Sequence, residues 1–344
     1  MRQRFRETIC LAAVAALLAI PATAAPNETV EAIKKRGEVA CGVSTGLSTG
    51  MSTLDDQGNW AGFEVDFCRA LATALLGAPT KVSFVPLEFK VAFASLQSGA
   101  VDLLARTGTW TYSRDADLNL DWAGIYIYDG QGFMVAKSLG VSSAKELDGA
   151  TICVTGGSTT ELNLADYFRT NGMQFTPIVG NGRDQNQQNL EAGRCDVYTN
   201  EIGGLASSRT AMSNPDDWVL LPEILSKEPT GPIIRQDDPV FRDIVYWTLA
   251  TLVAAEEFGV TQENVREMAA SSSNPEVQRI LGTTGEFGPM LGLTKDWAVK
   301  VIEATGNYGE IFARNLGENS PIKLERGLNR LWSDGGLLYA PPFR

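Results

Sequence analysis

Hydroxyl-bearing residues and one arginine gather in a single short segment of the sequence. Thr107-Gly108-Thr109-Trp110-Thr111-Tyr112-Ser113-Arg114 directly follows an apolar stretch that predicts a strand. The Arg114 guanidinium offers two parallel N–H donors, which match the two oxygens of a carboxylate in a way that a lysine cannot copy. The pattern therefore indicates a site for a small carboxylate-bearing molecule. A polar loop with a surface arginine is the alternative interpretation.

Two further segments could complete such a site. Gly156-Gly157-Ser158-Thr159-Thr160 joins a predicted strand to a predicted helix, and the free N–H groups at a helix start attract anions. The G-K-[ST] step of a nucleotide-binding P-loop is missing, and Ser and Thr here could simply cap the helix. Glu201 follows another predicted strand. It could bind an ammonium group or be a solvated surface glutamate.

The composition excludes several kinds of chemistry. The chain has no histidine, which removes Ser-His-Asp and Cys-His hydrolases, histidine-based zinc sites and histidine proton shuttles. No C-x-x-C motif points to a redox centre or a zinc ribbon. We therefore expect a binding protein rather than an enzyme, with no catalytic residue, no metal and no cofactor.

The N-terminus has the features of a secretory signal peptide. Arg2, Arg4 and Arg6 precede an apolar run at 9–20, and Ala22-Thr23-Ala24 ends in an A-x-A pattern, so we expect a signal peptide at 1–25. An uncleaved membrane anchor is the alternative. Cleavage removes three Arg and one Glu, which changes the formal charge from −12 to −12 − 3 + 1 = −14. Such an acidic chain is a poor binder of nucleic acid.

Four of the five cysteines remain after this cleavage, an even number in an oxidising compartment. We predict the disulfides Cys41–Cys68 and Cys153–Cys195, because each pair lies within one repeated block of the chain. Pairs between blocks would lock the two halves together. Four buried thiols are the alternative.

Two blocks of the chain repeat one order of predicted elements, which indicates an α/β fold of two lobes. Each lobe should hold a mostly parallel sheet flanked by helices, with a ligand cleft beyond the carboxyl ends of the strands. The first block predicts strands at 38–43, 81–85 and up to 105, and helices at 62–76 and 89–98. The second block predicts strands at 151–154, 174–179 and 197–199, and helices at 159–169 and up to about 192.

The rest of the chain favours helices, at 241–258, 297–302 and 324–332, before an extended end at Pro341-Pro342. We expect this C-terminal extension to pack on the lobes. Two strands near 126–132 and 226–231 should cross between the lobes. Lobe 1 then comprises 29–128 and 229–344, including the extension, and lobe 2 comprises 129–228.

Several segments resemble a known family. The sequence is similar, from about residue 29 to the C-terminus, to the general L-amino-acid binding proteins of polar amino-acid ABC uptake systems, in family 3 of periplasmic solute-binding proteins. The resemblance implies a two-lobed type II periplasmic binding protein fold with a helical C-terminal extension. It rests on Trp60-Ala61-Gly62-Phe63-Glu64-Val65-Asp66-Phe67-Cys68-Arg69, Tyr128-Asp129-Gly130-Gln131-Gly132-Phe133-Met134-Val135, Thr159-Thr160-Glu161-Leu162-Asn163-Leu164-Ala165-Asp166-Tyr167-Phe168, Gly306-Asn307-Tyr308-Gly309-Glu310-Ile311-Phe312 and Leu338-Tyr339-Ala340-Pro341-Pro342.

The resemblance also implies a role for each candidate residue. Arg114 matches the arginine that clamps the ligand α-carboxylate, Ser158 and Thr159 match the helix start that donates to it, and Glu201 matches the acid that binds the α-amino group. Thr107 and Thr109 match hydroxyl or backbone contacts, and Phe89 matches a side chain that packs over the ligand. The family usually has aspartate in place of Glu201 and threonine in place of Gly108, departures that affect ligand choice.

The implied function is capture of a small polar amino acid in the periplasm and delivery to ABC permease subunits in the inner membrane. We expect a monomer. Two other functions use the same fold, a dehydratase-like periplasmic enzyme and an amino-acid sensor subunit. Substrate turnover would identify the enzyme, and lack of a co-purifying permease would favour the sensor.

Overall fold

The computed structural model describes residues 28–45, 47–236 and 238–344 of the chain. The predicted signal peptide at 1–25 lies outside these residues. Within the described ranges, no helix has the length and apolar character needed to cross a membrane.

The first lobe is built on a five-stranded sheet with the order β5-β1-β6-β15-β7. The central β1 runs parallel to β5 and β6, whereas β15 runs antiparallel to β6 and β7. The strands are β1 Val39–Val43, β5 Val82–Pro86, β6 Leu103–Leu104, β7 Leu120–Trp122 and β15 Ile233–Arg235; the helices are α1 Glu28–Arg36, α2 Phe63–Leu76, α3 Phe89–Gln97 and α4 Tyr112–Leu118. A small antiparallel sheet of β2 Leu47–Ser48, β3 Ser52–Leu54 and β4 Trp60–Ala61 precedes α2.

The second lobe repeats this plan, with the order β11-β10-β12-β9-β13. Again β10 is parallel to two neighbours, and β9 is antiparallel to β12 and β13. Its strands are β9 Gln131–Ala136, β10 Thr151–Thr155, β11 Thr176–Gly180, β12 Val197–Glu201 and β13 Trp218–Leu220; its helices are α5 Thr159–Thr170, α6 Arg183–Glu191 and α7 Ile202–Ala211, with 3₁₀ turns η1 Lys137–Leu139, η2 Ala144–Glu146 and η3 Pro215–Asp217. Half of the pairings in each sheet are thus antiparallel, because β9 and β15 enter their sheets directly from the other lobe rather than through a helical crossover.

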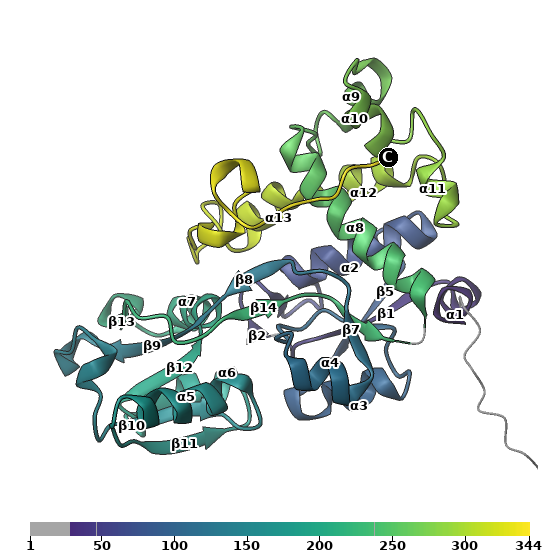
Figure 1. Cartoon of the computed structure of the whole chain (residues 1–344). Coiled ribbons are helices and arrows are strands. Elements are labelled where there is room, and N and C mark those ends of the chain that lie inside the picture. The colour runs from purple at the N-terminus through teal and green to yellow at the C-terminus, as the bar shows by residue number, and fades with distance from the viewer. Residues whose placement is uncertain (1–27, 46, 237) are drawn as a thin grey trace, which may run out of the picture.

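One antiparallel strand pair joins the two sheets. β8 Ile127–Asp129 pairs with β14 Glu228–Thr230, so that Asp129 lies opposite Glu228 and Ile127 opposite Thr230. These strands form at the two places where the sequence predicted crossings, and Figure 1 shows them running side by side between the lobes. We call this strand pair the hinge pair.

The C-terminal extension is helical and stacks on the first lobe, above α2 in Figure 1. It comprises α8 Pro239–Glu257, α9 Val265–Ser271, α10 Pro275–Ile280, α11 Phe287–Met290, α12 Trp297–Thr305 and α13 Tyr308–Asn315, followed by 3₁₀ turns η4 Gly327–Asn329 and η5 Trp332–Asp334. The predicted helix at 324–332 is wrong. Gly327 has a left-handed φ of +48°, and the Leu324 N–H bonds to the distant Leu316 carbonyl, so the segment lacks a helical ladder.

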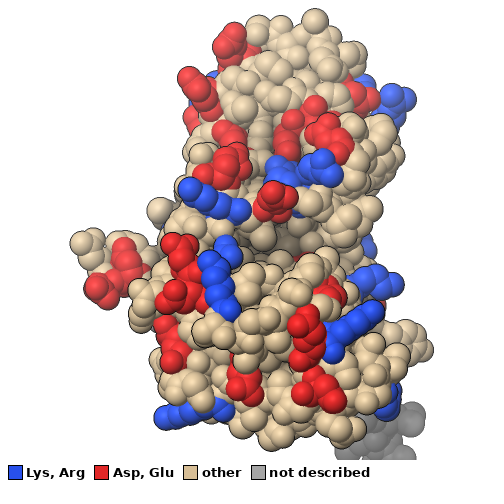
Figure 2. Space-filling model, turned by 90° about the vertical axis from the view of Figure 1, so that its left-hand side faces the viewer, with Lys and Arg blue, Asp and Glu red and all other residues tan. Residues whose placement is uncertain are grey.

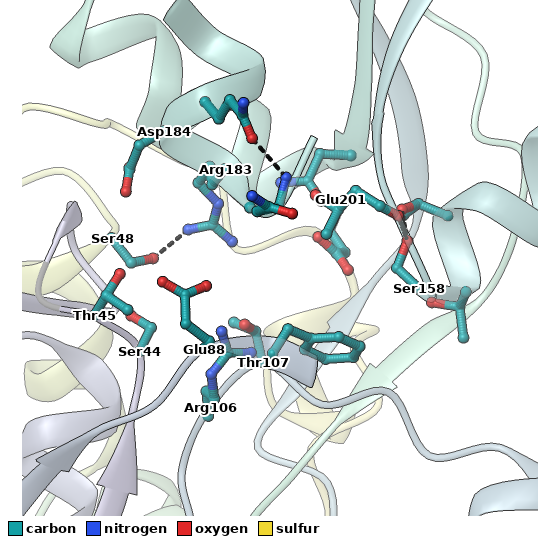
Figure 3. A pocket seen from close by; sticks show the side chains of 18 of the residues that line it. Ser44, Thr45, Ser48, Glu88, Arg106, Thr107, Ser158, Arg183, Asp184 and Glu201 are labelled. Carbon is teal, nitrogen blue, oxygen red and sulfur yellow. Dashed lines mark hydrogen bonds between the residues drawn. The ribbon is translucent and has the colours of Figure 1, made fainter. Parts of the chain in front are cut away.

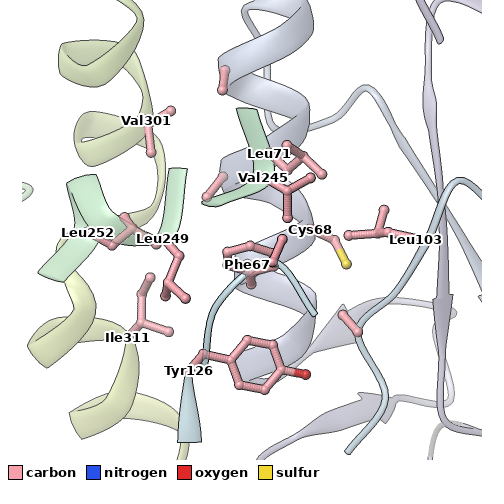
Figure 4. Packing of buried hydrophobic residues seen from close by; sticks show 14 of the residues in the cluster. Phe67, Cys68, Leu71, Leu103, Tyr126, Val245, Leu249, Leu252, Val301 and Ile311 are labelled. Carbon is pink, nitrogen blue, oxygen red and sulfur yellow. The ribbon is translucent and has the colours of Figure 1, made fainter. Parts of the chain in front are cut away.

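One apolar core joins the extension to the first lobe. Phe67 and Leu71 of α2 pack with Val245 and Leu249 of α8 and with Val301 of α12, and all five are buried (Figure 4). Burying a large apolar side chain of this kind contributes about 1.5–3 kcal/mol. The extension is therefore an integral part of this lobe, as the sequence predicted when it placed these helices on the lobes.

Two disulfides hold the sheets to their neighbouring elements. Cys41 of β1 is bonded to Cys68 of α2, and Cys153 of β10 is bonded to Cys195, just before β12. These are the two predicted pairs. Each disulfide lies within one lobe. The two lobes are therefore connected covalently through the chain segments of the hinge pair and not through a disulfide.

Candidate functional site

A cavity of about 410 Å³ lies between the two lobes, where the carboxyl ends of the strands of both sheets meet. Figure 3 shows its lining side chains arriving from both sides. All predicted ligand-binding residues except Arg114 line it. These are Phe89, Thr107, Thr109, Ser158, Thr159 and Glu201. Residues far apart in the chain therefore meet in one place.

Arg114 lies behind the cavity wall, outside the lining residues. Its Nη1 atom donates to the Thr109 carbonyl at 2.9 Å, and its guanidinium lies 5.3 Å from the Phe89 ring centroid and 5.1 Å from that of Phe93. Burial lowers its pKa, and the charges of Glu228 and Glu201 oppose this. Arg114 is thus a partly buried cation that contacts two lining residues, one layer away from the cavity itself.

Thr107 occupies a strained backbone conformation in the wall. Its φ of +34° is rare for a β-branched residue. The fully buried Glu64 carboxylate accepts from the Thr107 N–H and, at 3.1 Å, from the Tyr126 hydroxyl. Burial raises the pKa of Glu64. Glu64 was not among the predicted site residues, because an acid inside an apolar helix carries no local sign that it supports a distant loop.

The helix start of α5 lies in the second lobe, facing the first. Ser158 is the N-cap, and its hydroxyl accepts from the Glu161 N–H at 3.3 Å and donates to the Thr155 carbonyl at 2.6 Å. Thr159 comes next, with its hydroxyl oxygen 3.4 Å from that of Thr109. Ser158 therefore caps α5 and, together with Thr159, also lines the cavity. The capping role and the ligand-site role of this segment are thus compatible.

Glu201 ends β12, and Figure 3 shows it on the same side of the cavity as Arg183, because both belong to the second lobe. Burial raises its pKa to about 7; the charge of Arg183 opposes the rise, while Glu228 and Asp129 add to it. The carboxyl group is therefore poised to lose a proton near neutral pH. A cation entering the cavity would favour the ionised form.

Arg106 and Arg183 also line the cavity, although neither was predicted as a site residue. The Arg106 Nε donates to the Leu87 carbonyl at 2.8 Å, and its guanidinium lies 5.1 Å from the Phe89 ring centroid. Arg183, at the start of α6, donates to the hydroxyl of Ser48 from the other lobe. Arg106 precedes the predicted motif by one residue, a signal that could have identified it. Arg183 lies in a helix made almost entirely of polar residues, so no sequence pattern separates it from its neighbours.

Gly108 departs from the family pattern without altering the cavity wall. A Cβ atom added there would lie 2.6 Å from Ile233 Cδ1, and Gly108 is not among the lining residues. We expected this departure to affect ligand choice. A side chain added at this position would meet Ile233, and the effect of the departure on ligand choice stays a prediction.

The charges around the cavity are mixed. Glu88, Asp184 and Glu201 provide negative charge, and Arg106 and Arg183 provide positive charge. Over the face of the molecule in Figure 2, acidic and basic side chains are also interspersed. In the described part of the chain, no group of three or more acidic or cysteine side chains could hold a metal ion. The cavity suits a small molecule that carries both signs of charge.

Comparisons with known proteins place the chain in a family. It belongs to the bacterial extracellular solute-binding proteins, family 3, whose model matches residues 42–264. The resemblance seen in the sequence is therefore confirmed. The C-terminal part of the extension lies beyond the matched residues.

The chain is similar over nearly its whole length to named binding proteins. It is 54% identical over 332 residues to the general L-amino acid-binding periplasmic protein AapJ of Rhizobium johnstonii, covering 96% of this chain and 97% of that protein. It is 53% identical to the glutamate/glutamine/aspartate/asparagine-binding protein BztA of Rhodobacter capsulatus, covering 96% and 97%. These relatives are binding proteins, and this chain is likewise a solute-binding protein and not an enzyme.

A solved structure has the same fold as this chain. It is a periplasmic binding protein of an ABC transporter from Brucella ovis with glutathione bound, 51% identical, with a TM-score of 0.90, covering 92% of this chain and 99% of that one. The likeness includes the C-terminal extension, since the match spans more of the chain than the family model. It confirms the predicted two-lobed fold.

Proposed function

We propose that this chain captures a small polar L-amino acid in the cavity between its lobes and delivers it to the permease subunits of an ABC transporter in the inner membrane. The observation that carries the proposal is the pairing of opposite charges from opposite lobes, Arg106 from the first and Glu201 from the second, around one cavity of about 410 Å³. A zwitterion leaving water needs both of its charges paired, because an unpaired buried charge is strongly unfavourable. The names of the relatives support the same class of ligand.

In this proposal the ligand α-carboxylate lies toward the first lobe, and the α-ammonium toward Glu201. Arg114 reaches the carboxylate by a side-chain movement that brings its guanidinium past Phe89. The extra methylene of Glu201, compared with aspartate, takes space from the ligand and narrows the range of amino acids. Glu201→Asp should therefore broaden that range.

Closure of the two lobes traps the ligand, with the hinge pair as the bending point. The moving bodies are 29–128 with 229–344 and 129–228. The two bodies touch in this structure, since Lys90 Nζ of the first lobe donates to Asn181 Oδ1 of the second at 3.2 Å and the Ser207 hydroxyl donates to the Thr49 carbonyl at 2.7 Å. The protein acts as a monomer in the periplasm, to which residues 1–25 direct it.

A binding screen of the purified protein tests the proposal. Thermal unfolding is measured with each of the twenty L-amino acids and with glutathione, which is bound in the Brucella ovis structure. A ligand at a hundred times its Kd stabilises the folded state by about 2.7 kcal/mol, a readily measured shift. Calorimetry then gives the Kd of each compound that stabilises the protein. The substitution Glu201→Gln should weaken the affinity for an α-amino acid by more than about tenfold.

The outcome that would overturn the proposal is equally clear. If no amino acid or amino-acid derivative shifts the unfolding temperature, the cavity serves another ligand class. If the bound compound is consumed, the protein is an enzyme. Glu223→Gln is the matched control for Glu201→Gln, since Glu223 also lies in the second lobe, accepts from the Ser143 hydroxyl at 2.5 Å and lies outside the cavity lining.

A further inference from the structure

Glu228 is a buried acid in the hinge pair, and the proposed contacts with the ligand charges do not involve it. It lies in β14, opposite Asp129, and is 1% exposed. Among the ion pairs of the described residues none involves Glu228. Its carboxylate is instead surrounded by hydrogen-bond donors. These are the side chains of Thr109, Thr159, Asn163 and Ser226.

The donors divide between the two carboxylate oxygens. Oε1 accepts from Asn163 Nδ2 at 2.6 Å and from the Ser226 hydroxyl at 2.8 Å. Oε2 accepts from the Thr109 hydroxyl at 2.6 Å and from the Thr159 hydroxyl at 2.9 Å. The Oε2 atom of Glu228 therefore accepts hydrogen bonds from Thr109 of the first lobe and from Thr159 of the second.

This arrangement fixes the direction of two hydroxyl protons. A threonine hydroxyl has one proton and two lone pairs, and a carboxylate can only accept. Thr109 and Thr159 thus give their single protons to Glu228 and present lone pairs elsewhere. Their oxygens are 3.4 Å apart, and both residues line the cavity.

We propose that Glu228 is a positioning residue for ligand recognition, which turns the Thr109–Thr159 hydroxyl pair into an acceptor for the ligand ammonium and so selects amino acids over their 2-oxo acids. The inference rests on the proposed function, because it concerns the same cavity. The ammonium donates to the two hydroxyl oxygens, so the Thr159 side chain accepts from the ammonium instead of donating to the carboxylate as the resemblance implied. The negative charge of Glu228, one hydrogen bond further away, offsets the charge of the ammonium. Glu201 faces the same ammonium from its other side.

Glu228→Gln tests this proposal because the substitution keeps the shape and changes the proton direction. Asn163 Nδ2 can only donate, so the glutamine oxygen takes the place of Oε1 and the amide nitrogen takes the place of Oε2. That nitrogen donates to the Thr109 and Thr159 hydroxyls, whose protons then turn to the cavity. The variant site is suited to a keto oxygen and repels an ammonium.

The experiment measures Kd by calorimetry for an amino acid that the wild type binds and for the 2-oxo acid with the same carbon chain. L-glutamate with 2-oxoglutarate is the first pair, and L-alanine with pyruvate the second. Glu228→Gln should lower the wild-type preference for the amino acid by at least about tenfold, the effect of one charge-assisted hydrogen bond. Glu223→Gln is the matched control; Glu223 also accepts a serine hydroxyl, from Ser143 at 2.5 Å, but it lies outside the cavity.

The ratio of the two Kd values separates recognition from folding. Loss of a merely structural contact weakens both probes equally, so an unchanged ratio overturns the proposal. The proposal is also overturned if the ratio of the two Kd values changes in Glu201→Gln but not in Glu228→Gln. In that case Glu201, and not Glu228, selects amino acids over 2-oxo acids. If the wild type binds no amino acid at all, the proposed function itself fails, which is a different result.

Discussion

Asn329 of the C-terminal extension holds Tyr128 of the hinge pair by both backbone polar groups. Its Oδ1 atom accepts from the Tyr128 N–H at 2.7 Å, and its Nδ2 donates to the Tyr128 carbonyl at 3.0 Å. Tyr128 lies opposite Pro229, which has no N–H to offer. The extension thus adds hydrogen bonds to β8 at Tyr128, and Asn329, which supplies them, lies beyond the residues matched by the family model.

Asn329→Ala should loosen the hinge pair. Asn329 is 5% exposed, and the loss of two hydrogen bonds to the same backbone unit should destabilise the protein by about 1–3 kcal/mol. Amide exchange at Tyr128 should also become at least about tenfold faster. Denaturant unfolding and hydrogen exchange measure these effects. Asn171→Ala, which removes a single exposed bond to the Tyr167 carbonyl, is the control, and equal effects of the two variants would contradict this prediction.

Arg114→Lys should weaken the binding of an amino acid by about tenfold to a hundredfold, because the lysine loses the forked donors and the contact with the rings of Phe89 and Phe93. Calorimetry with the ligand found in the screen measures the change. Arg169→Lys, at an exposed pair with Asp166, should have no effect. A change of less than twofold for Arg114→Lys would remove this residue from the site.

Affinity for an amino acid should rise between pH 6 and pH 8. Burial raises the pKa of Glu201 to about 7, so most of the carboxyl groups are neutral at pH 6 and ionised at pH 8. The ligand ammonium keeps its proton over this range and binds the ionised form. Kd should therefore be about tenfold weaker at pH 6 than at pH 8.

Glu201→Gln should remove most of this pH dependence. Burial also raises the pKa of Asp129, to about 6, and Asp129 accepts from the Gly203 N–H at 3.0 Å. Asp129→Asn is therefore measured alongside. If the dependence persists in Glu201→Gln and disappears in Asp129→Asn, the titrating group is Asp129.

Removing either disulfide should destabilise its own lobe. The bonds close loops with sequence separations of 27 and 42, which correspond to about 3–4 kcal/mol each in the chain-entropy model. Replacing Cys153 and Cys195 together by serine should lower the unfolding temperature while leaving Cys41–Cys68 intact. Non-reducing peptide mapping checks the pairing, and a peptide joining Cys68 to Cys153 would contradict it.

The sequence alone was sufficient to predict the two-lobed fold and several residues of the cavity wall. Strands and helices follow from the spacing of apolar residues over a few turns, so the repeated blocks could be recognised in the sequence. Thr109 and Ser158 could be predicted as cavity residues because each follows a predicted strand of its lobe, and ligands bind beyond the carboxyl ends of the strands in such sheets. Each disulfide pairs two cysteines of the same block, and this could also be predicted.

Only the tertiary structure decided which side chains from distant parts of the chain come into contact. Glu228 and Thr109 are 119 residues apart, and Asn329 and Tyr128 are 201 apart; such contacts depend on the hinge pair and the folded extension, which no local pattern encodes. The helix predicted at 324–332 failed for a related reason, since the Leu324 N–H bonds to the distant Leu316 carbonyl and Gly327 takes a left-handed φ of +48°. Arg114 has the right chemistry and a suitable position in the sequence, but the packing of Phe89 and Phe93 places its guanidinium behind the wall. Local patterns define elements, whereas the direction of a side chain is set by its neighbours in space.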